Sequence, residues 1–253
     1  MPTFGFGAGA VWMTPLTDAT GAAIVNPTPL LVGTLQDASV DISGDVKELF
    51  GQNQFAEAVA RGKAKIDIKL KFARWNGALL NSIYFGQTMS SSIIGNVYDT
   101  TGAAIPSTPF QITPTVPVSG TWARDLGVRN ASGNPMTRVA SAPTTGQYSV
   151  AAGVYTFATA DTGLTVFISY AYTATSTVAK TSIVSNLAMG AAPTFRCDLT
   201  NGFNGNALAI SLYSCVATKL SMATKIDDFN IAEIDGSAFA NSAGQVLQWG
   251  TSE

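Results

Sequence analysis

The residue types that most often do chemistry are scarce in this sequence. Its 253 residues include no histidine, which excludes Ser-His-Asp hydrolysis, Cys-His proteolysis and histidine-ligated zinc, copper or haem. No P-loop, G-x-S-x-G or C-x-x-C pattern occurs either. Two cysteines, Cys197 and Cys215, lie in apolar runs joined by an expected hairpin. They are too few for a disulfide framework, and we favour two small buried hydrophobic side chains, with a disulfide as the alternative.

Acidic residues gather at the C-terminal end of the chain. Asp227 and Asp228 are adjacent, and Glu233 and Asp235 follow shortly after the last basic residue, Lys225. A calcium site at the adjacent pair would lack the ligand spacing of an EF-hand. Hydrolysis by paired carboxylates requires two acids that face one cleft, and the sequence alone does not place them so. We therefore expect no catalytic residue, no metal ligand and no cofactor, and we expect the chain not to be an enzyme.

Basic residues form a second cluster, with half of all lysines and arginines between residues 47 and 74. A solvated strand face is the simplest interpretation, and contact with phosphate or with an acidic neighbour is the alternative. The net charge of −2 argues against a dedicated nucleic-acid binder. The two charge clusters could instead attract each other between subunits, which would set orientation and register more than affinity. The candidates for this interface charge are Lys63, Lys65, Lys69, Lys71, Asp227, Asp228, Glu233 and Asp235.

The bulk composition points to a protein that hides its surface. Only 12% of the residues are charged and 46% are hydrophobic, whereas soluble domains average about 25% charged residues. Because surface charge keeps a free monomer soluble, so neutral a chain is expected to cover much of its surface with other chains. The longest uncharged stretches are interrupted by Gly, Pro, Ser and Thr, so we expect no membrane helix. Lys47 is the first basic residue, so we expect no secretory signal and a cytosolic, soluble product.

The elements that position these residues are mainly strands. Residues 63–72 alternate apolar and charged side chains, which predicts a strand with one apolar and one cationic face. Residues 74–85 switch to helical spacing, with Gly86 at the C-cap position. Residues 44–62 fit neither the strand period nor the helical period. They are interpreted as a long connection carrying apolar side chains, with a short helix at 54–60 as an option.

The remaining segments are predicted as strands and turns. Residues 1–29, with glycines at 5, 7 and 9, are expected to form an irregular or pairing arm rather than a phosphate cradle. Residues 147–173 are interpreted as a β meander with a turn at 161–163, and residues 201–206 as a hairpin turn. Further strands are expected at 30–32, 35–43, 110–112, 122–128, 136–139, 194–200, 207–220, 226–234 and 238–249.

Two parts of the sequence resemble bacteriophage tail tube proteins. In residues 33–86 the similar pieces are a strand ending in DIS, then KELFGQNQFAEAVARGK, the alternating strand, and FARWNGALLNSIYFG. Near the C-terminus, NGNALAISLYSCVATKLSMATKIDDFNIAEIDGSAFANSAGQVLQW is similar to the long strand and closing strands of that family. The resemblance covers about half of the chain. It implies a tail tube domain at 1–86 and 188–253 with an N-terminal arm, while 87–187 is either a β-rich insertion or the remaining tube-fold strands.

The resemblance also implies a fold and an assembly. The fold would be two packed antiparallel sheets, a sandwich or barrel, with one flanking α-helix. Six copies would form a ring whose sheets join into a continuous barrel, and rings would stack into a hollow tube that passes DNA without binding it specifically. The 44–62 connection would then pack onto a neighbouring subunit or ring. Its expected interface residues are Leu49, Phe50, Gln52, Asn53, Phe55, Val59 and Arg61.

The implied partners are those of a virion tail assembled in the cytoplasm of a host bacterium. They are further copies of the chain, a tape-measure protein, a tail terminator, baseplate proteins and, in a contractile tail, a sheath; no membrane is implied. A channel that releases DNA is expected to be lined by acidic or uncharged residues, with most side chains of Lys63–Lys71 at interfaces or outside. The alternative function is a virion decoration or receptor-binding β-sandwich module, and an enzyme ranks third.

Overall fold

The computed structural model describes residues 7–74, 76–224 and 226–252 and is mainly β, as the sequence predicts. The chain forms two compact units. Unit 1 comprises Met1–Thr88 and Ser182–Glu253, and unit 2 comprises Met89–Thr181. Strands β5 (Met89–Ser90) and β14 (Thr181–Ser182) pair with each other where the chain passes between the units. The sequence-based division at 87–187 lies close to these boundaries.

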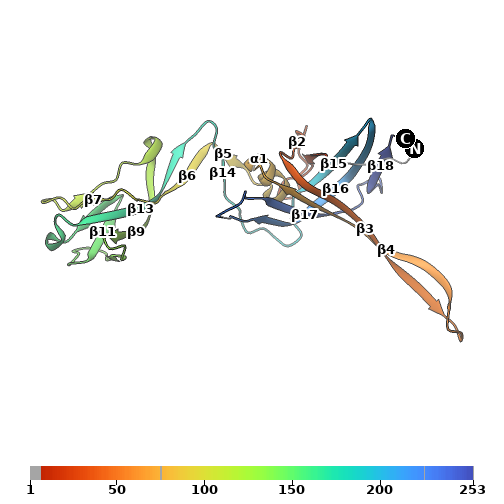
Figure 1. Ribbon diagram of the computed structural model, residues 1–253, viewed down its shortest axis with the longest axis horizontal. Helices are drawn as coiled ribbons and strands as arrows, with labels where there is room; N and C mark the ends of the chain where they lie inside the picture. The colour runs from red at the N-terminus through yellow and green to blue at the C-terminus, as the bar shows by residue number, and fades with distance from the viewer. Residues whose placement is uncertain (1–6, 75, 225, 253) are drawn as a thin grey trace. The chain divides into compact units, whose positions relative to one another are not determined.

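Unit 1 is built on one eight-stranded sheet in the order β2-β1-β15-β16-β17-β4-β3, with β18 also paired to β16. Within the described residues, all of its strand pairs are antiparallel. Figure 1 shows its strands, which are β1 (Ala10–Pro15), β2 (Leu30–Leu31), β3 (Leu35–Phe50), β4 (Ala56–Phe72), β15 (Thr194–Phe203), β16 (Asn206–Met222), β17 (Ala232–Ala238) and β18 (Leu247–Thr251).

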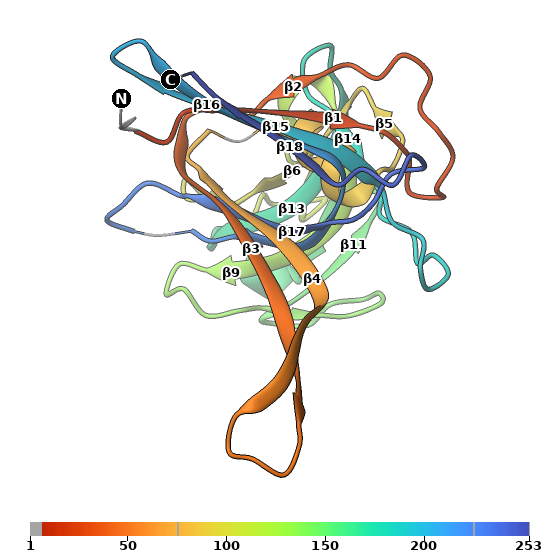
Figure 2. The same cartoon turned by 90° about the vertical axis from the view of Figure 1, so that its right-hand side faces the viewer.

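Strand β16 divides this sheet into two layers, because its two halves have different partners. Its first half pairs with β15 and β18, and its second half pairs with β17, with register shifts at Phe195/Cys197 and Ala217/Lys219. A strand that bends at such irregularities carries the sheet around a corner. The layers enclose one core in a sandwich-like arrangement (Figure 2). Its buried residues are Val11, Met13, Val32, Ile68, Leu70, Phe72, Leu79, Leu80, Ile83, Phe195, Cys197, Leu212, Cys215, Ala232 and Ile234.

The flanking helix is shorter than the sequence predicts. It begins at Gly77, not at residue 74, as α1 (Gly77–Leu80) and continues as the π-helical turn η1 (Asn81–Phe85). The side chain of Asn76 caps α1, since its Oδ1 accepts hydrogen bonds from the backbone of the first turn. Gly86 has the left-handed conformation (φ 60°) that ends the helix, which confirms its predicted C-cap role.

Unit 2 has its own core between two four-stranded sheets. One has the order β10-β11-β12-β8; in the other, β13 pairs with β6, β7 and β9. Its core consists of Ile105, Val128, Tyr148, Tyr155, Phe157, Val166, Ile168 and Tyr170. Its elements are β6 (Ser92–Val97), β7 (Ala103–Ala104), β8 (Gln111–Ile112), η2 (Pro117–Ser119), β9 (Thr121–Asn130), β10 (Thr137–Arg138), β11 (Gln147–Ala151), β12 (Val154–Phe157), η3 (Thr159–Asp161) and β13 (Thr165–Thr175).

Four sequence predictions are corrected by the structure. Residues 44–62 are not a connection with a helix, because β3 and β4 continue through them as one long hairpin with its turn at 51–55. The N-terminal segment is not irregular throughout, because β1 pairs with β15 and its side chains alternate in burial, which confirms the alternative of a pairing arm. The expected meander is split, because β12 and β13 belong to different sheets. The turn at 201–206 shrinks to Asn204 and Gly205, both with positive φ, as a two-residue hairpin turn requires.

Candidate functional site

The candidate site of unit 1 is the distal part of the β3–β4 hairpin, residues 41–65, which we call the extended hairpin. Every residue in it is exposed except Ala56, which is half-buried. Both figures show it projecting from the sheet that carries it (Figures 1 and 2). From Asp41 to Phe50, at about 3.3 Å per residue, the extended hairpin reaches roughly 30 Å from its root.

The extended hairpin carries six large apolar side chains that its own chain leaves uncovered. Phe55 at the tip is 84% exposed and Leu49 is 63% exposed. An isolated two-stranded hairpin is marginally stable in water, and a concentration of exposed apolar side chains marks an interaction site. The set is Ile42, Val46, Leu49, Phe50, Phe55 and Val59.

Both faces of the extended hairpin are mixed in character. In the antiparallel register Val46 lies opposite Arg61, and Glu48 lies opposite Val59. Leu49 falls on the other face. Apolar side chains on both faces of a ribbon are buried only when the ribbon is enclosed from both sides. The geometry therefore suits insertion between other surfaces better than attachment to one flat surface.

All seven residues expected at the stacking interface lie on the extended hairpin. Leu49 and Phe50 are at the end of β3, Val59 and Arg61 are on β4, and Gln52, Asn53 and Phe55 form the turn. The sequence pattern did not predict these parts of β3 and β4 as strands. Both faces of the extended hairpin are in solvent, so its apolar residues do not alternate with a period of two. Register shifts at Gly44/Val46 and Leu49/Phe50 break the alternation further.

The cationic strand and part of the acidic cluster meet within one chain. In the register of β17 with β4, Glu233 lies opposite Lys71 and Asp235 lies opposite Lys69. Lys219 of β16 contacts Glu233 at 3.0 Å and Asp235 at 3.7 Å. The hydrogen bond from Lys219 holds the pKa of Glu233 below its usual range. These charges form a ladder across three adjacent strands, in which Lys219 pairs with both acids without a second subunit.

The other charges assigned to an interface lie outside this ladder. Lys63 is exposed on the extended hairpin, and Lys65 forms a 2.8 Å ion pair with Asp67. Asp227 and Asp228 lie in the exposed segment between β16 and β17. The structure therefore brings together Lys69, Lys71, Glu233 and Asp235 and leaves the remaining four at separate places.

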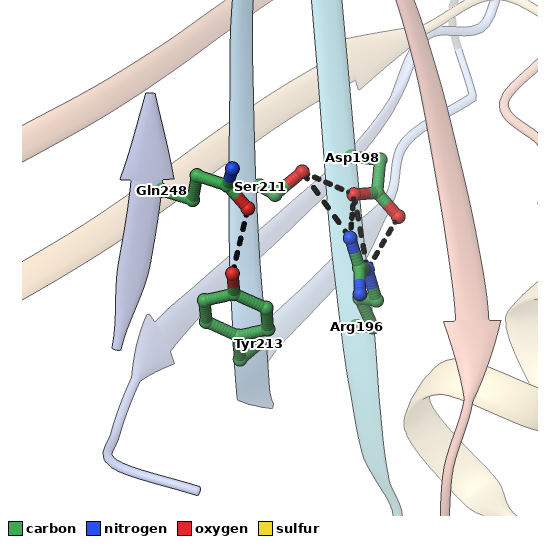
Figure 3. Close-up of polar contacts among 5 residues, drawn as sticks. All are labelled: Arg196, Asp198, Ser211, Tyr213 and Gln248. Carbon is green, nitrogen blue, oxygen red and sulfur yellow. Dashed lines mark hydrogen bonds and ion pairs between the residues drawn. The ribbon is translucent and has the colours of Figure 1, made fainter. Parts of the chain in front are cut away.

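A second polar cluster, which the sequence did not indicate, spans β15, β16 and β18 (Figure 3). The guanidinium of Arg196 donates through Nε and Nη2 to Asp198, with the shorter contacts at 2.9 Å, and Ser211 Oγ donates to the same carboxylate at 2.5 Å. Arg196 also lies over the Tyr213 ring at 5.2 Å, and the Tyr213 hydroxyl donates to Gln248 Oε1 at 2.7 Å. Asp198 raises the pKa of Arg196 through the hydrogen bond.

This cluster fixes strand register rather than offering a reactive group. Asp198 lies directly opposite Ser211 in the β15–β16 ladder, and Ser211 lies opposite Gln248 in the β16–β18 ladder. The Ser211 hydroxyl donates to Asp198 and accepts from Arg196, and these two groups are already joined in an ion pair. Arg196 and Asp198 alternate along one strand, but only the register identifies their partners on the neighbouring strands.

Unit 2 contains a buried carboxylate that joins its two sheets. The Asp125 side chain on β9 is 5% exposed. It accepts hydrogen bonds from the hydroxyls of Tyr148 at 2.8 Å and Tyr155 at 3.1 Å, and from the backbone of Gly127. Burial is the main cause that raises the pKa of both tyrosines. The Arg138 guanidinium lies 3.8 Å from the carboxylate. Asp125 therefore has an ion pair as well as its hydrogen bonds, and this network holds the two sheets together.

The cysteines are free and buried, which confirms the interpretation as small hydrophobic side chains over that of a disulfide. Burial raises the pKa of Cys197 to about 12, so its reactive thiolate form is suppressed. Within the part of the chain that the structure describes, no group of three or more metal-binding side chains comes together. No helix in that part has the length and apolar character needed to span a membrane.

Comparison of the sequence with protein-family models and with curated proteins gives no match. The assignment of any role therefore rests on the geometry of the chain itself, above all on the extended hairpin.

Proposed function

We propose that this chain is the structural subunit of a bacteriophage tail tube. In this proposal six copies form a ring, and stacked rings form a hollow conduit through which DNA passes. The single observation that carries the proposal is the extended hairpin, a projecting two-stranded ribbon with six exposed large apolar side chains. Such a ribbon is stable only when other protein surfaces enclose it, and the low charge of the chain fits enclosure by further copies.

The open edges of the unit 1 sheet support a repeating assembly. The sheet order ends at β2 and at β3, and β18 lies beside β16 as a third edge. Within the described residues, the sixteen-residue strand β3 pairs only with β4. A long unpaired edge invites pairing with another chain. Head-to-tail pairing of unlike edges around a ring would satisfy these strands and close the sheets into a barrel.

The charge ladder supports a conduit that does not retain DNA. Each phosphate neutralised by a lysine adds salt-dependent affinity. Lys69 and Lys71 lie opposite acidic residues of their own chain, so this strand presents alternating rather than uniformly positive charge. The proposed channel lining is acidic or uncharged, and a lysine-lined channel in the assembled particle would contradict the proposal. The tape-measure, terminator, baseplate and sheath partners belong to the same proposal.

The proposal is tested by the assembly state of the purified full chain. We expect ring-sized oligomers in sedimentation velocity and hollow tubes in negative-stain electron microscopy, growing with protein concentration. A monomer or trimer at every concentration would refute it. Such a result would favour the alternative, a virion decoration or receptor-binding module, which the separate core of unit 2 would suit.

A further inference from the structure

The chain contains three Asn-Gly pairs, which begin at Asn76, Asn201 and Asn204. In such a pair the backbone nitrogen of the glycine can attack the side-chain carbonyl carbon of the asparagine and close a five-membered ring. A following glycine favours this attack, because it carries no Cβ that would crowd the ring and its backbone rotates with little hindrance. By residue type the three pairs are equivalent, so any difference in their reactivity must come from the fold.

The first pair is held by a helix. Asn76 is the N-cap of α1, where its Oδ1 accepts hydrogen bonds from the backbone of Ala78 at 3.0 Å and of Leu79 at 3.4 Å. Gly77, whose nitrogen would attack, is the first residue of the helix. Ring closure turns the carboxamide and the following peptide toward each other, so at this site it must first undo the cap.

The second pair is held by the sheet. Asn201 lies on β15 opposite Leu208 of β16, and Gly202 lies opposite Ala207. The side chain of Asn201 is fixed as well, since its Nδ2 donates to the carbonyl of Gly7 at 2.7 Å. Ring closure at this site must break that hydrogen bond and twist the strand out of its ladder.

The third pair has neither restraint. Asn204 and Gly205 form the turn between β15 and β16, and the ladder ends beside them where Phe203 lies opposite Asn206. Both turn residues are exposed, and the space beside the Cα of Gly205 is open. No described residue forms a hydrogen bond with the Asn204 side chain. An exposed turn rotates at a lower cost than a paired strand or a capped helix.

We propose that Asn204 is a site of spontaneous deamidation. The Gly205 nitrogen loses its proton to hydroxide and bonds to Cγ of Asn204, and the carboxamide nitrogen leaves as ammonia with a proton from water. Water then opens the succinimide ring at either of its carbonyl carbons, which gives aspartate or isoaspartate. The net reaction consumes one water and releases one ammonia without transfer of electrons, so it needs no other reactant.

Both products change the tip of the β15–β16 hairpin. Each places a carboxylate at residue 204, which lowers the formal net charge of the chain from −2 to −3 at pH 7. Isoaspartate also lengthens the main chain by one carbon, so the tip loses the two-residue turn with positive φ at both positions. The pairing of Phe203 with Asn206 should then loosen. Leu212, buried further along the same ladder, keeps this part of unit 1 folded.

The test follows the unassembled full-length chain at mildly alkaline pH by tandem mass spectrometry of tryptic peptides. The peptide that follows Arg196 carries both Asn201 and Asn204, and its fragment ions separate the two sites. We expect Asn204 to convert at least about fivefold faster than Asn76 or Asn201, because each of these must first lose a cap or a hydrogen bond worth about that factor. In guanidinium chloride the three sites should convert at similar rates. Faster conversion at Asn76 or Asn201 in the folded chain, or equal rates at all three, would overturn the proposal.

A pair of variants checks the assignment by charge. Asn204→Gly removes the reacting carboxamide and keeps a residue suited to positive φ. In isoelectric focusing the wild type should develop an acidic form that this variant lacks. The matched control is Asn206→Ser, at a neighbouring asparagine followed by alanine, and it should acidify as the wild type does. Acidification of Asn204→Gly at the wild-type rate would refute the site, and neither result bears on the tail tube proposal, which is tested by assembly.

Discussion

Removing the aromatic side chains at the tip of the extended hairpin should block assembly and leave the subunit folded. Phe50 and Phe55 are 57% and 84% exposed in the free chain, so neither contributes to the unit 1 core. In the double variant F50S/F55S the free energy of unfolding should change by no more than about 0.5 kcal/mol, as for other surface positions. The effect should appear only in contacts between copies.

The size of that effect follows from the exposed fractions. Full burial of a phenylalanine contributes about 1.5–3 kcal/mol. Burying the fractions that Phe50 and Phe55 expose in the free chain therefore contributes about 2–4 kcal/mol for each docked tip. At 1.4 kcal/mol for each factor of ten, the double variant should raise the critical concentration for assembly by roughly 30- to 1,000-fold.

The assay is the concentration of chain left in the supernatant after assembled material is pelleted, measured across a dilution series. The matched control is L164S/V178S, which removes two exposed apolar side chains from unit 2 and should shift the critical concentration by less than roughly threefold. A similarly small shift for F50S/F55S, with tubes of normal appearance, would refute the argument that the hairpin tip drives assembly.

Three other predictions concern the units themselves. In D125A the hydroxyls of Tyr148 and Tyr155 lose a buried acceptor, so the free energy of unfolding of unit 2 should fall by about 2–6 kcal/mol. The measurement is denaturant unfolding followed by the fluorescence of Trp122. Adding Y148F should recover part of that loss, and no recovery would exclude an unsatisfied Tyr148 hydroxyl as a cause. Cys197 and Cys215 should react with a thiol reagent at pH 8 only as fast as unit 1 unfolds, because burial raises the pKa of both thiols; rapid labelling of the folded chain would contradict this. The pKa of Glu233 is lowered from 4.5 by Lys219, so its stabilising effect is present above that range and lost as pH falls through the depressed pKa. The difference in Tm between the wild type and E233Q should therefore shrink as the pH drops below about 4.5, and a difference constant with pH would contradict the ion pair.

The sequence predicted those elements whose two faces differ. Residues 63–72 were identified as a strand because Ile68, Leu70 and Phe72 enter the core while Lys69 and Lys71 remain exposed. The position of Gly86 was predictable because a helix end requires a residue that tolerates positive φ. In both cases a local physical constraint restricts which residue types can occupy the position, so the sequence alone indicates the structure.

The remaining features depend on information that a local pattern does not contain. The extended hairpin has solvent on both faces and bulges within it, so its residue order shows no strand period. Strand β1 is short and lies among glycines and prolines, and its stability comes from pairing with β15, far along the chain. The network at Asp125 and the cluster at Asp198 each include partners 13 or more residues away, and the positions of these partners are set by strand register.

The few charged residues of the chain are used largely in contacts within the chain. Several of its few charges form ion pairs within one chain, in the ladder from Lys219 to Glu233 and in the pair of Arg196 with Asp198. The extended hairpin, in contrast, presents uncovered apolar side chains. Charge paired within the subunit does little to attract a neighbour, because the field of a close pair falls off rapidly with distance. In the proposed assembly, contacts between copies would therefore be driven mainly by apolar burial at the hairpin and directed by the shapes of the surfaces that enclose it. The charges would set the register of strands inside each subunit.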